Sequence, residues 1–184
     1  MDKKELKQIL YTAMGDDDLK FYAPKGKIIR YDELQRYNNI DELLKMDLDY
    51  CIILYNVNTP NSGHWIGLLK YPENNTLEYF DPYGKTVDEP LKWVSEEQLK
   101  QSGILKPYLG DLLNKSNRNI IYNPIAYQSK KEGISTCGRH TIFRIINLIK
   151  YNKTLTQYYN LMKKLKKDLN CNYDDIVSFF ISRI

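Results

Sequence analysis

The spacing of apolar residues predicts a helix at the start of the chain. Over residues 3–14 the apolar side chains recur at i, i+3, i+4 and i+7, which is the period of one helix face. A run of Gly and Asp that begins at Gly15 ends this pattern. Residues 16–47 are mixed and polar, and we expect them to form a surface layer with short helices at 32–37 and 40–46.

Short apolar runs in the middle of the chain predict β-strands. Residues 50–55 form an unbroken apolar run, which is typical of a strand buried on both faces. Residues 56–63, rich in Asn, Thr, Pro, Ser and Gly, read as a loop. Strands are expected at 64–71 and 76–80, and because the connections are short the three strands should form an antiparallel meander. Residues 119–122 read as a fourth strand.

Helical periodicity returns after these strands. Residues 95–114 look helical and amphipathic, with interruptions at Gly103 and Pro107. Residues 154–168 and 173–183 show two further helical patterns.

Between the helical patterns at 95–114 and 154–168, a further helix is predicted from Cys137 to about Lys150. Ser135 or Thr136 is placed to cap its N-terminus. The expected core stripe of this helix consists of Ile142, Ile145, Ile146 and Ile149.

The order of these elements predicts the fold class. A helix is followed by strands and then by helices, without an internal repeat, linker or low-complexity segment. This order indicates a single α+β domain over residues 1–184, with a central, mainly antiparallel sheet flanked by helices.

The composition excludes several classes of protein. Of the 184 residues, 42% are hydrophobic and 27% are charged, so overall disorder is not expected. No run approaches the ~20 apolar residues that cross a bilayer, and no apolar signal core follows residues 1–5. We therefore expect an intracellular protein that is neither secreted nor bound to a membrane.

Residue usage carries a hint about origin. Lys (21), Asn (16), Tyr (16) and Ile (19) are abundant, whereas Ala occurs three times. The four abundant types have AT-rich codons, which is typical of the AT-rich genomes of some viruses, protists and bacteria.

The chain has few residues that could perform nucleophilic chemistry. It contains three widely spaced cysteines, which do not imply a disulfide framework and are expected to be reduced. His64 and His140 are its only histidines, and either one, taken alone, is more often structural than catalytic. Cys137 and His140 form one C-x₂-H pair, but the second ligand pair of a usual zinc site is missing, so no metal is expected.

Cys137 has the surroundings expected of a reactive thiol. A cysteine at a helix N-terminus lies at the positive end of the helix dipole, which lowers its pKa. Gly138, which follows it, would allow the backbone of a substrate to approach closely. Cys51 lies in an apolar strand and reads as a core thiol, and Cys171 reads as a loop residue.

Asp81 is a candidate partner for His64. If strands 64–71 and 76–80 form a hairpin, the start of the first lies beside the end of the second, which brings His64 and Asp81 together. An acid in that place would fix the tautomer of the imidazole and stabilise its protonated form. Glu78 and Asp88 are nearby alternatives, and Asp81 is preferred because it is the first residue after the strand.

Four short motifs occur in a telling order: Gly63-His64-Trp65, then Phe80-Asp81-Pro82-Tyr83-Gly84, then Gln128, then Thr136-Cys137-Gly138. Together they resemble the adenain/Ulp1-like cysteine proteases (clan CE), the group that contains the adenovirus maturation protease and the SUMO- and NEDD8-specific proteases. The resemblance spans 63–138. It implies a papain-like arrangement in the permuted order His-Asp-Gln-Cys, with the nucleophile at the N-terminus of a buried helix.

The resemblance also implies a role for each matched residue. Cys137 would be the nucleophile, His64 the general base and acid, and Asp81 the residue that orients His64. Gln128 would donate its side-chain amide to the oxyanion, beside the backbone N–H of Cys137 or Gly138. The chemistry would need no cofactor. Trp65 would pack beside the catalytic pair or line the substrate cleft, with a plain core position as the alternative.

Several substrates remain open within this resemblance. The first expectation is a thiol endopeptidase that cleaves viral capsid or core precursors near Gly during virion maturation. It would act as a monomer in the host cytoplasm or virus factory and be packaged in the virion. A deubiquitinase or deSUMOylase is the alternative. An acetyltransferase with the same triad and a binding module that has lost activity are further alternatives. Thr136 stands where the SUMO-protease branch often has Asp, which argues against that branch.

Positive charge is concentrated near the C-terminus. Residues 139–167 contain eight basic residues and no Asp or Glu, so with a net charge of +4 the rest of the chain sums to −4. Such a face can bind phosphates. Because adenovirus-type proteases are stimulated by DNA and a short peptide, DNA or an activating peptide is a candidate activator, with Cys171 as the candidate thiol for a disulfide-linked peptide. The alternative is a solvated helix face. The candidate nucleic-acid contacts are Arg139, Arg144, Lys163, Lys164, Lys166 and Lys167.

Overall fold

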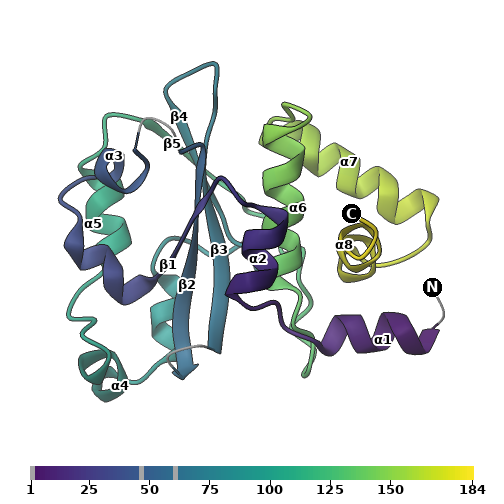
Figure 1. Cartoon of the computed structure of the whole chain (residues 1–184), viewed down its shortest axis with the longest axis horizontal. Coiled ribbons are helices and arrows are strands. Elements are labelled where there is room, and N and C mark those ends of the chain that lie inside the picture. The colour runs from purple at the N-terminus through teal and green to yellow at the C-terminus, as the bar shows by residue number, and fades with distance from the viewer. Residues whose placement is uncertain (1–2, 46–47, 60–61) are drawn as a thin grey trace.

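The centre of the molecule is a five-stranded sheet whose strands lie in chain order (Figure 1). The computed structural model describes residues 3–45, 48–59 and 62–184. The three inner strands run antiparallel, and each outer strand pairs with its neighbour in parallel. The strands are β1 (Lys27–Arg30), β2 (Tyr50–Thr59), β3 (Ser62–Lys70), β4 (Thr76–Phe80) and β5 (Asn119–Tyr122).

The apolar runs account for the inner strands. Residues 51–55 of β2 are all buried, which confirms the prediction of a strand covered on both faces. All five residues of β4 are buried as well. β1 was not predicted, because four residues with two apolar side chains carry too little periodicity to be recognised.

Helices cover both faces of the sheet (Figure 1). On one face lie α1 (Lys3–Tyr11), α2 (Asp16–Tyr22), α6 (Cys137–Ile149), α7 (Leu155–Asp168) and α8 (Tyr173–Ile181). On the other lie the 3₁₀ helix η1 (Tyr31–Arg36), α3 (Ile40–Leu43), α4 (Glu96–Gln101) and α5 (Tyr108–Asn114). A second 3₁₀ helix, η2 (Glu89–Trp93), follows β4. This confirms the predicted α+β fold class with helices flanking the sheet.

Several sequence predictions need correction. The segment 56–63 is strand rather than loop at both ends, since β2 continues to Thr59 and β3 begins at Ser62; residues 60–61 lie outside the described residues. Helices α2 and η2 were not foreseen. The short helix expected at 40–46 ends at Leu43, and residue 46 lies outside the described residues.

The expected surface layer at 16–47 is also wrong in part. Leu19 of α2 packs into the cluster of buried side chains on the α6 face of the sheet. Tyr31, Leu34, Ile40 and Leu43 pack into the cluster on the opposite face. Their spacing is irregular because several short elements contribute one or two side chains each, and a single helix period does not describe such a segment.

Helix α6 is held against the sheet by a buried ion pair. The Arg144 Nε and Nη2 atoms each lie 2.7 Å from an oxygen of Glu78 on β4, and both side chains are fully buried. The hydroxyl of Tyr71 donates a further hydrogen bond to Glu78 at 2.6 Å. Arg144 is therefore a core residue, and its prediction as a nucleic-acid contact is wrong.

The core stripe predicted for α6 is correct over most of its length. Ile142 and Ile145 are buried, and Ile146 packs against the same cluster. Ile149 is 41% exposed, because α6 ends at this residue and the sheet no longer covers it. In the part of the chain that the structure describes, no helix is both long and apolar enough to span a bilayer.

Candidate active site

The hairpin of β3 and β4 brings His64 and Asp81 together as predicted. His64 lies near the start of β3 and Asp81 directly follows the antiparallel β4, so both lie at the same end of these two strands. The Nε2 atom of His64 lies 2.9 Å from Oδ1 of Asp81. Both side chains are buried, which shields their interaction from water.

Asp81 is the acidic residue with the geometry to orient His64. Its Oδ1 also accepts a hydrogen bond from the backbone N–H of Tyr83 at 2.7 Å. The two alternatives have other partners: Glu78 binds Arg144, and Asp88 accepts a hydrogen bond from the hydroxyl of Tyr31 at 2.6 Å. The sequence argument that preferred Asp81 because it is the first residue after the strand therefore agrees with the contacts.

Cys137 is the first residue of α6, and its thiol lines the same cavity as His64. The imidazole of His64 is close enough to lower the pKa of this thiol. Asp81 is bonded to Nε2 of His64, which leaves Nδ1 as the ring nitrogen available to the thiol. The order thiol, imidazole, carboxylate is that of a nucleophile, its base and the group that orients the base.

The electrostatics of this pair favour a thiolate and an imidazolium. Burial opposes ionisation of Cys137, but the hydrogen bond and charge of His64 and the backbone N–H of Trp65 and of Gly138 outweigh it, so the pKa of the thiol is lowered. Burial also favours the neutral form of His64. Its hydrogen bonds to Asp81 and Cys137 outweigh that effect and raise its pKa to about 9.

The other two thiols lack these features. Cys51 is fully buried in β2, and burial raises the pKa of its thiol far above the ordinary value. Cys171 lies in the loop before α8, and partial burial likewise raises its pKa. Both positions agree with the sequence interpretation, and among the three cysteines Cys137 alone has a lowered pKa.

Gln128 lies on a loop that passes beside Cys137. Its side chain is buried, lines the same cavity as His64 and Cys137, and donates a long hydrogen bond of 3.3 Å to the carbonyl of Ile134. The backbone N–H groups of Tyr127 and Gln128 both donate to the carbonyl of Pro82, at 2.8 and 2.9 Å. The loop is thereby tied to the turn that follows Asp81.

The cavity at this site has a volume of about 300 Å³. Two aromatic rings that the sequence analysis did not assign cover His64: the Tyr83 ring stacks on it with centroids 4.8 Å apart, and the Trp93 ring lies at 5.4 Å. Tyr83 was part of a quoted motif, but no sequence signal marked Trp93. The lining residues are Ala13, Met14, Gly63, His64, Trp65, Tyr83, Trp93, Gln128, Ile134, Ser135 and Cys137.

A second hollow lies on the two rings, beside this cavity. It has a volume of about 310 Å³ and is lined by Tyr83, Lys85, Trp93 and Lys130, so it shares Tyr83 and Trp93 with the cavity at Cys137.

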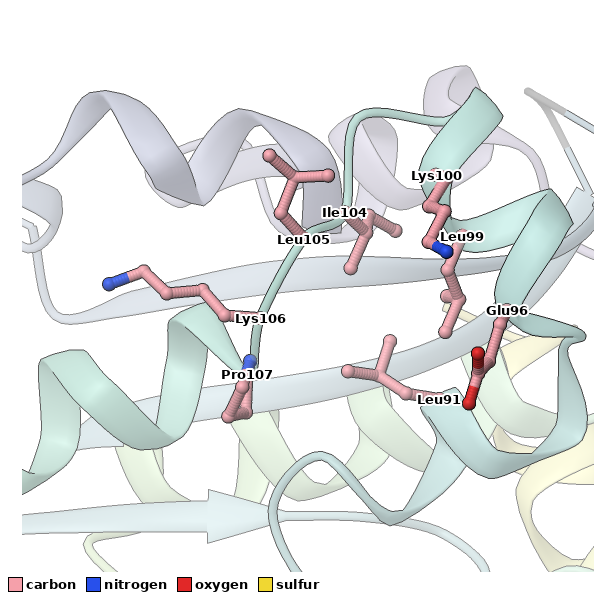
Figure 2. Close-up of a pocket in the computed structure, with 8 residues that line it drawn as sticks. All are labelled: Leu91, Glu96, Leu99, Lys100, Ile104, Leu105, Lys106 and Pro107. Carbon is pink, nitrogen blue, oxygen red and sulfur yellow. The ribbon is translucent and has the colours of Figure 1, made fainter.

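A more apolar cavity of about 360 Å³ lies beyond η2, between that helix, α4 and the segment that leads into α5. Figure 2 shows Leu91, Leu99 and Ile104 pointing into a common hollow, while the side chain of Lys106 extends away from it. Its lining contains no thiol or imidazole. Leu91 and Trp93 lie on the same short helix, η2, which therefore forms a wall of this cavity and of the cavity at Cys137.

The two supporting residues that were predicted differ in outcome. Trp65 lines the cavity at Cys137, although it is only 5% exposed and its indole N–H donates to the carbonyl of Met14 at 3.0 Å. Gly138 does not line the cavity. A Cβ atom on Gly138 would lie 3.0 Å from Cβ of Met14, so the missing side chain makes room for Met14 rather than for a substrate backbone.

The predicted nucleic-acid contacts separate into two groups. Arg139 is only 9% exposed and donates to the carbonyls of Thr12 and Ser135, at 2.7 and 3.3 Å, so together with Arg144 it is wrongly predicted as a surface contact. Four lysines of α7 are exposed: Lys163, Lys164, Lys166 and Lys167. Within the described ranges, no group of three or more His, Cys, Asp or Glu side chains is placed to hold a metal ion.

Comparison with known proteins gives one sequence relative and several similar structures. No family model matches the chain. The chain is 31% identical over 166 residues to the uncharacterized protein V9 of Sputnik virophage, a match that covers 86% of this chain and 93% of V9.

The similar structures are proteases and a protein called ChlaDub1. The ASFV pS273R protease matches with a TM-score of 0.46 and 14% identity, over 80% of this chain and 62% of that one, so the chain spans about three-fifths of its length. The C-terminal Ulp1 protease domain in complex with Smt3, the yeast ortholog of SUMO, matches with a TM-score of 0.42 and 11% identity, over 97% and 80% of the two chains. ChlaDub1 from Chlamydia trachomatis matches with a TM-score of 0.40 and 13% identity, over 99% and 89%. By its sequence, the chain belongs to the family of the Sputnik virophage protein V9.

Proposed function

We propose that this protein is a cysteine peptidase in which Cys137, His64 and Asp81 form the catalytic triad. The observation that carries the proposal is the placement of the Cys137 thiol and the His64 imidazole at the wall of one cavity, with Nε2 of His64 bonded to the buried carboxylate of Asp81. The lowered pKa of the thiol and the raised pKa of the imidazole support it, because they favour the thiolate nucleophile.

The reaction follows from this charge distribution. The Cys137 thiolate attacks the carbonyl carbon of a peptide bond, forming a carbon–sulfur bond and an oxyanion. As the carbon–nitrogen bond breaks, the His64 imidazolium gives its proton to the leaving amine and a thioester remains. Water, deprotonated by His64, then attacks the thioester, and the carbon–sulfur bond breaks to release a carboxylic acid and regenerate the thiolate.

Gln128 is proposed to stabilise the oxyanion. Its side-chain amide lies in the same cavity as Cys137 and donates a long hydrogen bond to the carbonyl of Ile134, so the amide is available to a stronger acceptor. Backbone N–H groups in the first turn of α6 provide further donors.

For the substrate, we propose a viral capsid or core precursor that is cleaved near Gly during virion maturation. Membership of a family with a virophage protein supports a viral setting. The cavity supports a small residue at the cleaved bond, because the rings of Trp65, Tyr83 and Trp93 line it. The proposed place of action is the virus factory of the host cell, with packaging into the virion.

An activating role for nucleic acid is proposed only for the four exposed lysines of α7, since Arg139 and Arg144 are buried. Replacing Lys163, Lys164, Lys166 and Lys167 together by Gln should remove DNA retardation at low salt. Turnover that is insensitive to salt and to added DNA would contradict this role.

Covalent trapping of the wild type and of Cys137→Ala tests the proposed function. One probe is a short peptide ending in Gly-Gly with a C-terminal electrophile, and the other is ubiquitin or SUMO with the same electrophile. Labelling of Cys137 by the peptide probe, with none in Cys137→Ala, is the expected result. Strong labelling by the protein probe alone would replace the maturation protease by a deubiquitinase or deSUMOylase. If neither probe labels Cys137, with or without DNA, the proposal is wrong.

A further inference from the structure

We propose that Asp174 is a positioning residue of the active site, which holds the loop of Gln128 and the start of the Cys137 helix in fixed relation to each other. This inference rests on the proposed function, since it concerns the donors around the same thiol. Asp174 lies 37 positions after Cys137 in the sequence, on the first turn of α8, and is buried.

The first contact of Asp174 is to the loop of Gln128. Its Oδ2 atom accepts a hydrogen bond of 3.0 Å from the backbone N–H of Ser129, the residue after Gln128. On the other side, the backbone N–H of Gln128 donates to the carbonyl of Pro82. Gln128 therefore lies between two anchors on consecutive amides, one on the turn after Asp81 and one on α8.

The second and third contacts are to α6. The hydroxyl of Thr136, which immediately precedes the nucleophile, donates to Oδ1 of Asp174. Thr136 occupies the N-cap position of α6 but makes no side-chain cap there, so its hydroxyl is used for Asp174 instead of its own helix. The Nε2 atom of His140, one turn further along α6, lies 3.0 Å from the same oxygen.

These contacts make one carboxylate the link between both sides of the oxyanion site. Burial raises the pKa of Asp174, but the hydrogen bonds from His140, Thr136 and Ser129 outweigh it, so the pKa is lowered and the carboxylate stays charged at neutral pH. A charged acceptor makes stronger hydrogen bonds than a neutral one, so its three donors are held firmly.

Asp174 does not belong to the triad. The hydrogen bonds of its carboxylate go to Ser129, Thr136 and His140. His64 has its own acid in Asp81, on a different element. Loss of Asp174 should therefore displace the amide of Gln128 relative to the thiol while leaving the thiol activated. That separation makes the role measurable.

The experiment compares two reactions of Cys137. Acylation by 4-nitrophenyl acetate passes through an oxyanion and needs its donors, whereas alkylation by iodoacetamide needs only the thiolate. In Asp174→Ala, acylation should fall about 100-fold, the size of effect seen when one oxyanion donor is lost. Alkylation should stay within about twofold of the wild type.

Two further variants separate positioning from stability. Asp174→Asn can keep all three hydrogen bonds. The Asn carbonyl accepts from Ser129, and the Asn amide donates to Thr136 and to the other tautomer of His140. Acylation in this variant should therefore be within about fivefold of the wild-type rate. Asp175→Ala removes the next carboxylate of α8, which caps the helix through Asn172, and should lower the melting temperature without changing the ratio of the two rates.

The proposal is overturned if a folded Asp174→Ala keeps the wild-type ratio of acylation to alkylation, or if both rates fall together. If Asp174→Ala does not fold, Thr136→Val takes its place, because it removes one of the three donors to Asp174. Acylation in Thr136→Val should fall about fivefold. An unchanged ratio of acylation to alkylation would again overturn the proposal. If peptide and protein probes fail on the wild type while the ratio falls in Asp174→Ala, the positioning role holds and the peptidase function fails.

Discussion

The molecule contains two buried histidine–aspartate pairs with nearly the same geometry and opposite electrostatics. In each pair the Nε2 atom lies close to an aspartate oxygen, at 2.9 Å for His64 with Asp81 and at 3.0 Å for His140 with Asp174. The pKa of His64 is nevertheless raised, whereas the pKa of His140 is lowered.

The remaining neighbours of each ring account for this difference. Burial favours the neutral form of both rings. His64 has a second acidic partner in the Cys137 thiol, and the two anions together outweigh burial. Among the described residues, His140 has one acidic partner, Asp174, and its Nδ1 atom has no hydrogen-bond partner. Because Arg139 adds a positive charge nearby, burial prevails. An aspartate neighbour therefore does not by itself make a catalytic histidine.

The largest expected effect on turnover comes from breaking the His64–Asp81 pair, whereas breaking the His140–Asp174 pair should have a small effect. His64→Ala should reduce turnover on the order of 10⁵-fold, close to Cys137→Ala, because base and nucleophile act as a unit. His140→Asn should cost no more than about 10-fold and act mainly on stability. Steady-state kinetics on a peptide substrate measures both. Comparable losses in the two histidine variants would show that the assignment of their roles is wrong.

Removing the orienting acid should have the next largest effect. Asp81→Ala should lower kcat about 10³–10⁴-fold, less than loss of the nucleophile, since an orienting carboxylate contributes less than the groups that react. It should also shift the pH dependence of Cys137 alkylation to higher pH. Without Asp81 the pKa of His64 falls, so less imidazolium remains to stabilise the thiolate. An alkylation profile that does not move would contradict the proposed link between Asp81 and the thiol.

The pH dependence sharpens the same comparison. The thiolate of Cys137 should persist below the ordinary thiol value of 9.0, because its pKa is lowered, and alkylation should decline only as the pH falls through this lowered value. Turnover should decline again as the pH rises through about 9, where His64 loses its proton. Iodoacetamide rates between pH 5 and 10 test the first decline, with Cys137→Ala as the background control, and turnover of a peptide substrate over the same range tests the second. In His64→Ala the reactive thiolate should appear only at high pH, and a profile like that of the wild type would refute the ion pair.

The smallest expected effect on the reactivity of Cys137 comes from removing Arg144, the partner of a third buried carboxylate, Glu78. Arg144→Met would leave the charge of Glu78 unpaired in the core and should lower the free energy of unfolding by about 3–5 kcal/mol. The alkylation rate of Cys137 in the folded variant should not change, because this ion pair does not contact the triad. Denaturant unfolding and alkylation measured on the same sample separate the two effects. A large loss of thiol reactivity would mean that Glu78 takes part in catalysis.

Much of the proposed triad could be predicted because it depends on local order in the chain. His64 and Asp81 belong to one hairpin with a short turn, so their pairing follows from the strand pattern alone. Cys137 was recognisable from its place at a helix start beside Gly138. Elements with little periodicity escaped prediction, as β1, α2 and η2 show, because a few residues in a short segment do not define a face.

The residues that sequence reasoning missed lie on separate segments of the chain. Trp93 reaches His64 from η2, and Asp174 reaches Thr136 from α8, 38 positions away along the chain. No spacing rule connects such pairs. The same limit explains the errors at Arg139 and Arg144, which were taken as part of a basic surface although both turn into the protein.

The sequence by itself determined the fold class, the inner strands, the reactive thiol and its local partners, because hydrophobic period and turn chemistry act over neighbouring residues. Only the tertiary structure decided which charges are buried, which aromatic rings cover the imidazole, and why the pKa values of the two histidines shift in opposite directions. These depend on the packing of α6 and α8 against the sheet, where burial and the full set of neighbours set the charge state of each group.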